Sequence, residues 1–340
     1  MLELSPSYHK WSKNTTLMPK IHLGFSKENV KFIFGIPTVY RNKESYLIRT
    51  LKNLFDNLTI NEKNISHFIV FIGETEESFV NNILSDIKLH FQDEIDNGLL
   101  EVISPPNEWY PDMTKLKITL NDSDLRVRWR TKQNLDFSYL WLFVRSKSGK
   151  YYVQLEDDII SKSSYVSEMT NFITLQTRKH PDWIVLDFCS LGFIGKLFKI
   201  TDLASFIVQY LIFYNDKPVD WLLSDYLRTK VCSLDQTHKQ CLNNINNIMI
   251  GKKPSLFQHI GKYSSLNGKI QKLQDKSFIK EKFLFKPHSN PEAEVNTTLI
   301  TYENHTFDNI YKGTDFYWAL EPKNKDYIII KFKKPQNLEK

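Results

Sequence analysis

Short apolar runs alternate with segments of helical periodicity between about residue 30 and residue 190. The apolar runs are expected to be strands, because about four to eight apolar residues bounded by turn signals are typical of buried strands. These strands are Phe32–Ile36, His67–Ile72, Leu100–Ser104, Tyr151–Leu155 and Trp183–Phe188. The periodic segments are expected to be helices, and they are Ser45–Leu58, Glu76–Ile95, Arg130–Arg145 and Ser163–Arg178. This alternation predicts an α/β fold with a mostly parallel sheet and helices on both of its faces.

The pattern changes in the last third of the chain. Leu203–Tyr214 and Asp220–Arg228 are expected to be helices, and three strand-like runs follow. The runs are Thr297–Tyr302, Phe316–Leu320 and Tyr327–Phe332, with prolines between them. We therefore expect three parts: an N-terminal extension (1–28), a main α/β domain (29–288) and the start of a β-rich module (289–340). That module is too short to close into a full sandwich.

Charge and hydropathy exclude some classes of function. The net charge is +6, but lysine and arginine are scattered and form no dense run, so nucleic acid is not expected as a partner. A few local basic groups facing phosphates would explain the surplus equally well. No apolar run is long enough to span a membrane, and residues 1–20 are too polar for a signal peptide. Neither a membrane anchor nor a targeting segment is expected in this chain.

The cysteines and the N-x-[ST] sites bear on the compartment. Cys232 and Cys241 lie close together in a polar segment, where they form either a disulfide in an oxidising compartment or two unrelated thiols. Cys189 lies in an apolar segment and is expected to be buried and free. Six candidate glycosylation sites favour a lumenal protein: Asn14, Asn57, Asn64, Asn121, Asn296 and Asn304. The glycosylation sites favour a lumenal protein, whereas no targeting segment is visible in this chain, and these two observations conflict.

Three consecutive acids, Glu156-Asp157-Asp158, follow the apolar strand that ends near Leu155. Ligands of open α/β sheets bind beyond the carboxyl ends of the strands, and a divalent cation relieves the repulsion among adjacent carboxylates. Mg²⁺ and Mn²⁺ take such oxygen ligands and complete their shells with substrate phosphates. The position after a buried strand favours a metal and diphosphate site over a solvated acidic turn.

Four cations, Arg126, Arg128, Arg130 and Lys132, lie near the expected start of a helix. Anions rather than cations are favoured at a helix N-terminus, so the cluster is explained by a bound diphosphate or by a solvated basic helix end. The chain has no Walker A loop and no G-x-G-x-x-G motif, which argues against an ATPase and against a dehydrogenase.

Several segments resemble the N-acetylglucosaminyltransferase IV family, in order and over nearly the whole chain. They include Gly35–Val39, Val70–Thr75, Glu101–Pro106, Arg126–Asn134, Gln154–Ile159, Leu191–Lys196, Asp220–Leu223, Pro254–Gly261, Ser264–Ser265 and Gly268–Leu273. The resemblance implies a GT-A-type, Rossmann-like nucleotide-sugar fold in the Golgi. It also implies inverting transfer of GlcNAc from UDP-GlcNAc, in β1,4 linkage, to the α1,3-arm mannose of N-glycans.

The family's site residues carry over by position. The resemblance implies a metal ligand at Asp158, for Mn²⁺ or Mg²⁺, beside Glu156 and Asp157 in the acidic signature. It implies a glycine loop near the donor sugar, and His259 contacts the diphosphate or the metal unless its role is structural. The implied UDP site and glycine loop comprise Gly35, Pro37, Thr38, Arg128, Lys132, Asp136, Gly192 and Gly195.

Asp220 is the residue that the resemblance offers as the catalytic base, because an inverting transfer needs one carboxylate to deprotonate the acceptor hydroxyl. Two positions depart from the family: Asp187 stands for a glutamate, and Ser224 replaces an aspartate, with Asp225 one position later. The C-terminal β domain is only begun. The alternative function is therefore a non-catalytic member that binds and inhibits another Golgi N-acetylglucosaminyltransferase.

Overall fold

A mixed eight-stranded sheet is the largest element within the described part of the chain. The computed structural model describes residues 18–266, 270–271, 273–278 and 288–337. In spatial order the strands are β1 (Ile21–Leu23), β4 (Leu100–Ser104), β3 (Ser66–Ile72), β2 (Val30–Thr38), β5 (Gly149–Gln154), β8 (Lys196–Lys199), β7 (Val185–Asp187) and β9 (Met249–Gly251). The α/β expectation is confirmed, although the sheet is mixed and contains antiparallel pairs at β1–β4, β5–β8 and β7–β8.

The strand order reverses beside β2. The chain passes from β2 to β3 and β4 on one side, and then returns to place β5 on the other side of β2. Both β3 and β5 pair with β2 in parallel, so the carboxyl ends of the three strands lie at one edge. Such a reversal leaves a crevice between two strand ends, and open α/β sheets bind ligands there.

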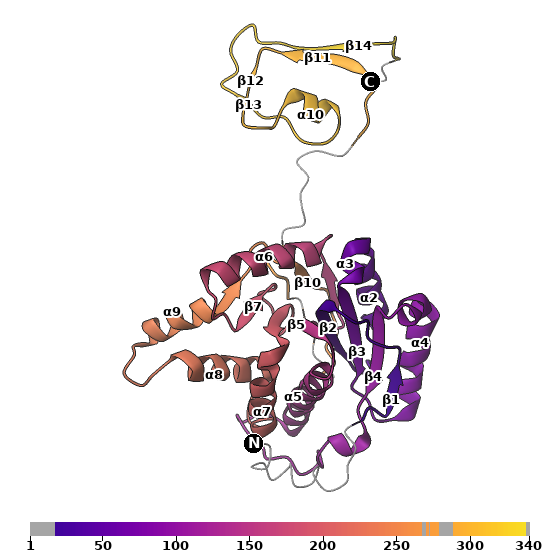
Figure 1. Ribbon diagram of the computed structural model, residues 1–340, viewed down its shortest axis with the longest axis vertical. Helices are drawn as coiled ribbons and strands as arrows, with labels where there is room; N and C mark the ends of the chain where they lie inside the picture. The colour runs from indigo at the N-terminus through magenta and orange to yellow at the C-terminus, as the bar shows by residue number, and fades with distance from the viewer. Residues whose placement is uncertain (1–17, 267–269, 272, 279–287, 338–340) are drawn as a thin grey trace. The chain divides into compact units, whose positions relative to one another are not determined.

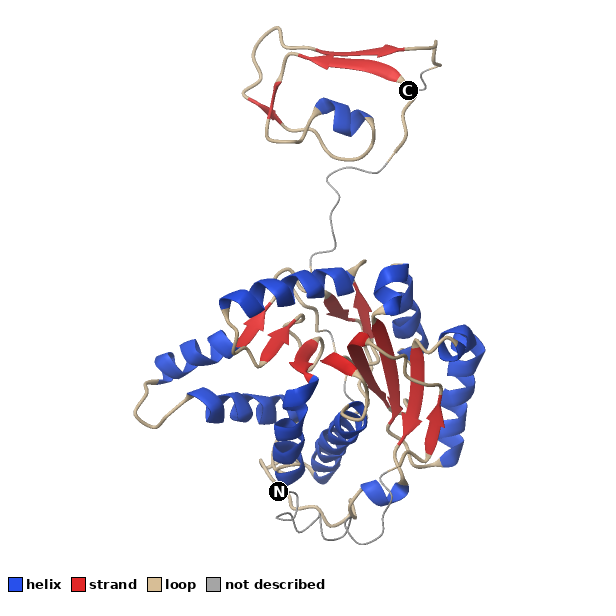
Figure 2. Cartoon of the chain, in the orientation of Figure 1, coloured by secondary structure: helices blue, strands red, loops and turns tan. Residues whose placement is uncertain are grey.

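Helices cover both faces of the sheet (Figures 1 and 2). One apolar cluster packs α2 (Leu47–Asp56), α4 (Glu77–Asp96) and α6 (Tyr165–Lys179) on one face, and a second packs α5 (Asp124–Val144), α7 (Leu203–Ile212) and α8 (Val219–Val231) on the other. Successive residues of β2 alternate between the clusters, with Phe32 and Phe34 in the first and Ile33 in the second. Burial on both faces explains why this strand is continuously apolar.

A buried carboxylate ties β1, β3 and β4 together. Glu101 on β4 is fully buried and accepts hydrogen bonds from His67 (2.8 Å), Lys147 (2.6 Å) and His22 (2.5 Å). Burial alone would raise the pKa of Glu101, but these three hydrogen bonds and the charge of Lys147 outweigh that effect and lower the pKa to about 2.

Helix α5 begins earlier than its apolar pattern predicts. Ser123 accepts a hydrogen bond from the backbone N–H of Arg126 and so caps the helix at Asp124, rather than near Arg130. The four cations therefore lie over successive turns of the helix and do not gather at its first residue.

Most of the other expected elements are present, but short and polar ones were missed. The missed elements in the first unit are α3 (Ile60–Asn64), α9 (His238–Ile248), the strands β1, β8 and β9, and the antiparallel pair β6 (Ile159–Ser161) and β10 (Phe257–His259). The β6–β10 pair brings His259 opposite Ile159, directly after the acidic triplet.

The chain divides into two compact units, 1–278 and 279–340. In the second unit β11 (Ala293–Thr297) pairs with β14 (Ile328–Phe332), β12 (Ile300–Thr301) pairs with β13 (Ala319–Leu320), and α10 (Phe307–Tyr311) accompanies them. The division of the chain at 28 and 288 stays a prediction. Asn14, Gly268, Lys269 and Lys272 lie outside the described residues.

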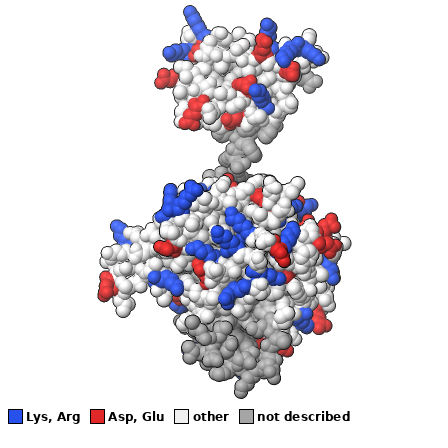
Figure 3. All heavy atoms as spheres, in the orientation of Figure 1, with Lys and Arg blue, Asp and Glu red and all other residues white. Residues whose placement is uncertain are grey.

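Acidic and basic side chains both occur over the face of the larger unit drawn in Figure 3, with basic ones commoner over its middle. A mixed surface differs from the basic stripe that nucleic-acid binding typically requires. The absence of a nucleic-acid partner stays a prediction. Among the described helices, none combines the length and apolar character needed to cross a bilayer.

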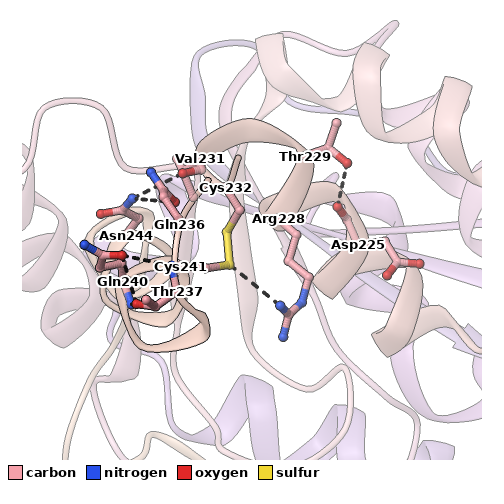
Figure 4. Close-up of a disulfide and its surroundings, with 10 residues drawn as sticks. All are labelled: Asp225, Arg228, Thr229, Val231, Cys232, Gln236, Thr237, Gln240, Cys241 and Asn244. Atoms are coloured by element: carbon pink, nitrogen blue, oxygen red, sulfur yellow. Dashed lines mark hydrogen bonds between the residues drawn. A yellow bond between two sulfur atoms is a disulfide. The ribbon is translucent and has the colours of Figure 1, made fainter. Parts of the chain in front are cut away.

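A disulfide joins Cys232, directly after α8, to Cys241 in α9 (Figure 4). The guanidinium of Arg228 points at the Cys241 Sγ from one turn earlier in α8, at 3.7 Å. Cys189 is buried and free, as expected. Of the described sequons, Asn57 has its side-chain amide hydrogen-bonded to Ser161, whereas the other asparagines are exposed: Asn64, Asn121, Asn296 and Asn304.

Candidate active site

A cavity of about 610 Å³ opens at the carboxyl ends of β2 and β5. Its walls come from the ends of both strands, from α5, from the turn around Gly192 and from the start of α8, and they also include His259, Ser264, Ser265, Gln271 and Leu273. Predicted site residues that line it are Pro37, Thr38, Lys132, Asp136, Glu156, Asp157, Asp158, Gly192, Asp220 and His259. Gly35, Arg128 and Gly195 do not line it, and their roles stay predictions.

The three acids point to different partners. Thr38, at the end of β2, donates a hydrogen bond to Asp157 Oδ2 at 2.6 Å, which fastens the two strand ends together. Asp158 Oδ2 lies 3.3 Å from the guanidinium of Arg41 and 3.4 Å from His259 Nε2. Glu156 accepts a longer bond, 3.4 Å, from the backbone N–H of Phe193. The triplet is therefore a built part of the cavity and not a solvated turn.

The residues present fit a divalent cation. Glu156, Asp158 and His259 each offer a ligand atom, and these atoms lie within 4.8 Å of one another. Asp158 Oδ1 is buried and has no hydrogen-bond partner among the described residues. An unpartnered buried carboxylate oxygen is unfavourable unless a cation or water satisfies it. Two carboxylates and an imidazole suit Mn²⁺ better than Mg²⁺, which prefers oxygen ligands.

Crowding shifts the protonation of these groups. Burial, followed by the charge of Asp158, raises the pKa of Glu156 to about 7. Burial also raises the pKa of Asp157, although Arg41 opposes it. Burial lowers the pKa of His259, but its contacts with Asp158 outweigh that effect and the net shift is upward. Burial and the charge of the neighbouring acids therefore act in the same direction on Glu156 and Asp157, and the pKa values of both rise.

Two glycines allow the backbone to approach the acids. Gly192 has a φ of +48°, and a side chain there would meet Glu156 Oε1 at 3.1 Å. Gly261 lies still closer to Asp158, because an added Cβ would come within 2.1 Å of its Oδ2. Gly195 has a different environment, because its nearest neighbour is the ring of Phe257.

The part of the cavity near the end of β3 is held by an ion pair within α5. Lys132 Nζ lies 2.7 Å from Asp136 Oδ2 and also donates to the carbonyl of Gly73, while the hydroxyl of Tyr110 donates to Asp136 Oδ1. Burial raises the pKa of Asp136, and Lys132 opposes that shift. Glu74, which follows β3, also lines this wall, and burial raises its pKa.

The other cations of α5 make ion pairs and hydrogen bonds within the protein. Arg130 is buried and donates to Asp122 (3.1 Å) and to the backbone carbonyl of Asn215 (2.9 Å). Arg126 pairs with Asp122, and Arg128 pairs with Asp124 one turn earlier. Lys132 lines the cavity, whereas these three arginines do not.

Asp220 lies in the first turn of α8, where it is exposed and lines the cavity. The positive end of the helix dipole favours a carboxylate there. The other candidate bases lie outside the cavity lining: Asp187 pairs with the buried Lys196 at 2.7 Å, and Asp225 pairs with Lys217 at 2.7 Å.

Sequence reasoning missed Arg41, Glu74 and Trp129, which also line the cavity. Arg41 follows β2 at the same sheet edge as the acids, but its contact with them depends on the path of a loop. Glu74 belongs to a segment that the resemblance covers. Trp129 also belongs to such a segment, and its indole N–H donates to Ser265, 136 positions later in the chain, at 3.0 Å.

Fold and cavity together define an α/β protein with a ligand site at a topological switch point, suited to an anionic ligand held with a divalent cation. Comparison with known families identifies it more closely. Residues 2–278 match the MGAT4 conserved region, and residues 293–340 match the MGAT4 C-terminal domain. The chain belongs to the MGAT4 family, which confirms the expected kinship with N-acetylglucosaminyltransferase IV.

Curated relatives match almost the whole chain. It is 48% identical over 331 residues to the Rattus norvegicus protein named alpha-1,3-mannosyl-glycoprotein 4-beta-N-acetylglucosaminyltransferase A, which covers 97% of this chain and 62% of the relative. It is 45% identical over 332 residues to the Danio rerio protein named for the B form, with coverages of 98% and 60%. The chain thus spans about three fifths of the length of these relatives.

Solved structures show a more distant similarity. S. aureus TarS 1-349 in complex with UDP-GlcNAc matches at a TM-score of 0.34 and 11% identity, over 64% of this chain and 71% of that one. The mannosyltransferase PcManGT from Pyrobaculum calidifontis, in complex with GDP-Man and Mn²⁺, matches at 0.33 and 9%, over 59% and 52%. At these TM-scores the similarity carries no argument about the site.

Proposed function

We propose that this protein is an inverting, GT-A-type glycosyltransferase that moves GlcNAc from UDP-GlcNAc, in β1,4 linkage, onto the α1,3-arm mannose of N-glycans. One observation carries the proposal. The acidic triplet and Asp220 line the same cavity, in a chain that is 48% identical to a protein named for that reaction.

On this proposal the triplet side of the cavity holds the donor diphosphate. Asp158, with Glu156 and His259, would hold Mn²⁺ or Mg²⁺, which when bound neutralises the charge that develops on the leaving diphosphate. Lys132, which is paired with Asp136, contributes an ammonium group to the cavity lining. Pro37, Thr38 and Asp136 also line the cavity and would contact the nucleoside part.

Asp220 would act on the acceptor. Its carboxylate takes the proton of the mannose hydroxyl as that oxygen attacks the anomeric carbon from the face opposite the leaving diphosphate, so the configuration inverts. The carboxylate faces the cavity from the first turn of α8, on a different element from the triplet. An acceptor and a donor could thus enter from different sides.

The departures at Asp187 and Ser224 are one of the grounds for the alternative, a non-catalytic member that inhibits another N-acetylglucosaminyltransferase. Neither residue lines the cavity, so these departures leave the proposed donor and acceptor groups in place. The disulfide between Cys232 and Cys241 supports an oxidising compartment, for which the Golgi lumen is the natural candidate.

Incubation of the purified chain with UDP-GlcNAc, Mn²⁺ and a biantennary N-glycan tests the proposal. One added GlcNAc is expected, with its β1,4 linkage to the α1,3-arm mannose established by NMR. Normal binding of UDP and Mn²⁺ without any product would reject the enzymatic function and favour the inhibitory one. Inhibition of a second N-acetylglucosaminyltransferase by the same preparation would then be measured.

A further inference from the structure

Arg41 lies where a cation is expected. It follows β2, and its guanidinium donates to Asp157 and lies 3.3 Å from Asp158 Oδ2. Its side chain is 10% exposed, while those of Asp157 and Asp158 are 5% and 6% exposed. The guanidinium is thus a buried positive charge in direct contact with two of the three acids.

The position of Arg41 is fixed from two directions. Its second terminal nitrogen donates to the carbonyl of Tyr263 at 2.8 Å, and its guanidinium lies 5.4 Å from the ring centroid of Tyr46. The hydroxyl of Tyr46 in turn accepts bonds from the backbone N–H groups of Lys262 and Tyr263, each at 3.1 Å. The loop after β2 is therefore joined through Arg41 to both the triplet and segment 262–263.

Two polar atoms in this arrangement lack a partner among the described residues. One is Asp158 Oδ1, an acceptor, and the other is Arg41 Nε, a donor. A buried donor without an acceptor is costly, and an anion in the cavity would supply one. The two atoms without partners thus favour ligands of opposite charge: a cation at Asp158 Oδ1 and an anion at Arg41 Nε.

We propose that Arg41 is a resident counter-ion of the acidic triplet, which keeps the affinity for the divalent cation low until a nucleoside diphosphate draws the guanidinium away. This inference rests on the proposed function, because it assumes that the cavity takes a metal and a diphosphate. Without the diphosphate, Arg41 and the metal compete for the charge of Asp157 and Asp158. With it, the phosphates accept from Arg41, and the triplet is left to the metal.

The consequence is cooperative binding of the metal and the diphosphate. The diphosphate removes Arg41 from the acids that the metal needs, and the metal replaces the positive charge that the acids lose with Arg41. A positive charge a few ångströms from the metal position weakens metal binding by about tenfold or more, even with strong screening. Metal and nucleotide therefore bind together, and the triplet does not trap free divalent cations.

Mn²⁺ titrations followed by EPR, with and without saturating UDP, test the inference on the whole chain. Arg41→Gln is expected to tighten Mn²⁺ binding in the absence of UDP by about tenfold and to shrink the gain in affinity that UDP causes. Arg41→Lys keeps the charge and is expected to stay within about threefold of the wild type. Lys43→Gln removes an exposed charge from the same loop and is the matched control, with no change expected.

Each outcome bears on the inference. Unchanged or weaker Mn²⁺ binding by Arg41→Gln without UDP would overturn it, as would equal tightening by Arg41→Lys. If Arg41→Gln does not fold, Arg41→Met, which keeps an apolar stem over Tyr46, replaces it. If the wild type binds no Mn²⁺ even with UDP, the proposed function fails as well. If UDP tightens Mn²⁺ binding equally in the wild type and in Arg41→Gln, the role of Arg41 is rejected, while the proposed function stands.

Discussion

Lys132 Nζ lies 2.7 Å from Asp136 Oδ2, one turn apart on α5, and both residues line the cavity that also contains the acidic triplet. The carboxylate is buried, and the ammonium group is its cationic partner. The pair therefore contributes both to the fold and to the charge that a donor would meet.

Lys132→Met is expected to lower the free energy of unfolding by about 3 kcal/mol, because it leaves the buried Asp136 carboxylate without its counter-ion. Asp136→Asn added to that variant should restore much of the loss. Urea unfolding of both variants measures this. Lys115→Met, which removes the exposed partner of Asp112, serves as the control and should leave the midpoint unchanged. No recovery in the double variant would contradict the ion-pair account.

Asp158→Asn keeps the shape of the side chain and removes its charge. We expect the Mn²⁺-dependent affinity for UDP to fall by about a hundredfold, since Asp158 offers the buried oxygen that a cation would satisfy. UDP binding in EDTA should stay unchanged. Isothermal titration calorimetry measures both, and the exposed Asp182→Asn is the control. Equal Mn²⁺-dependent binding by Asp158→Asn would remove Asp158 as the ligand.

Asp220→Asn should lower turnover of UDP-GlcNAc and acceptor by about a thousandfold, the range expected when a general base is lost. The affinity for UDP should remain within about twofold of the wild type, because the base acts only in the transition state. Asp225→Asn, on the same helix but paired with Lys217 outside the cavity, is the matched control. Surviving turnover in Asp220→Asn places the base elsewhere.

Acid should destabilise the protein through Glu101. Its folded pKa of about 2 lies below its ordinary value of 4.5, so its contribution is complete above pH 4.5 and is lost as the pH falls toward 2. The difference corresponds to about 3 kcal/mol. Glu101→Gln should lose that stability at neutral pH and show a flatter decline between pH 4.5 and pH 2. An unaltered acid profile in urea titrations would show that Glu101 is not responsible.

Removal of the disulfide should loosen the α8–α9 hairpin. A bond that closes a loop of this length contributes about 2.5 kcal/mol by restricting the unfolded chain. The double variant Cys232→Ser, Cys241→Ser should lose that amount in urea unfolding, and dithiothreitol should then have no further effect on it. The wild type in dithiothreitol should match the variant. Cys189→Ser provides the control for the free thiol.

The sequence predicted the parts of the fold that depend on local pattern. The strands from Phe32 to Leu155 were found because burial on both faces makes them continuously apolar. The early start of α5 was missed because its signal is one capping residue, Ser123, within a polar segment. The strand β8 was missed because Lys196, which is buried by its pairing with Asp187, breaks the apolar run.

The candidate site was predictable where it follows strand ends. The triplet after β5 and Thr38 at the end of β2 meet in the structure through a hydrogen bond that joins residues 119 positions apart. Arg41 was not predicted, because its role depends on a loop whose path no periodicity describes. Arg126 and Arg130 were grouped with Lys132 by sequence, yet helix geometry turns them toward Asp122.

The Cys232–Cys241 bond closes the far end of the same helix whose first turn carries Asp220. Recombinant protein made in a reducing cytosol would therefore keep the acidic triplet and Lys132, while α8, which carries the proposed base, would lack its disulfide to α9. Such a preparation would bind UDP and still transfer GlcNAc poorly, and it could not be distinguished by these two measurements from an inactive member of the family. Production in an oxidising compartment, with the disulfide verified by mass spectrometry, has to precede any judgement about catalysis.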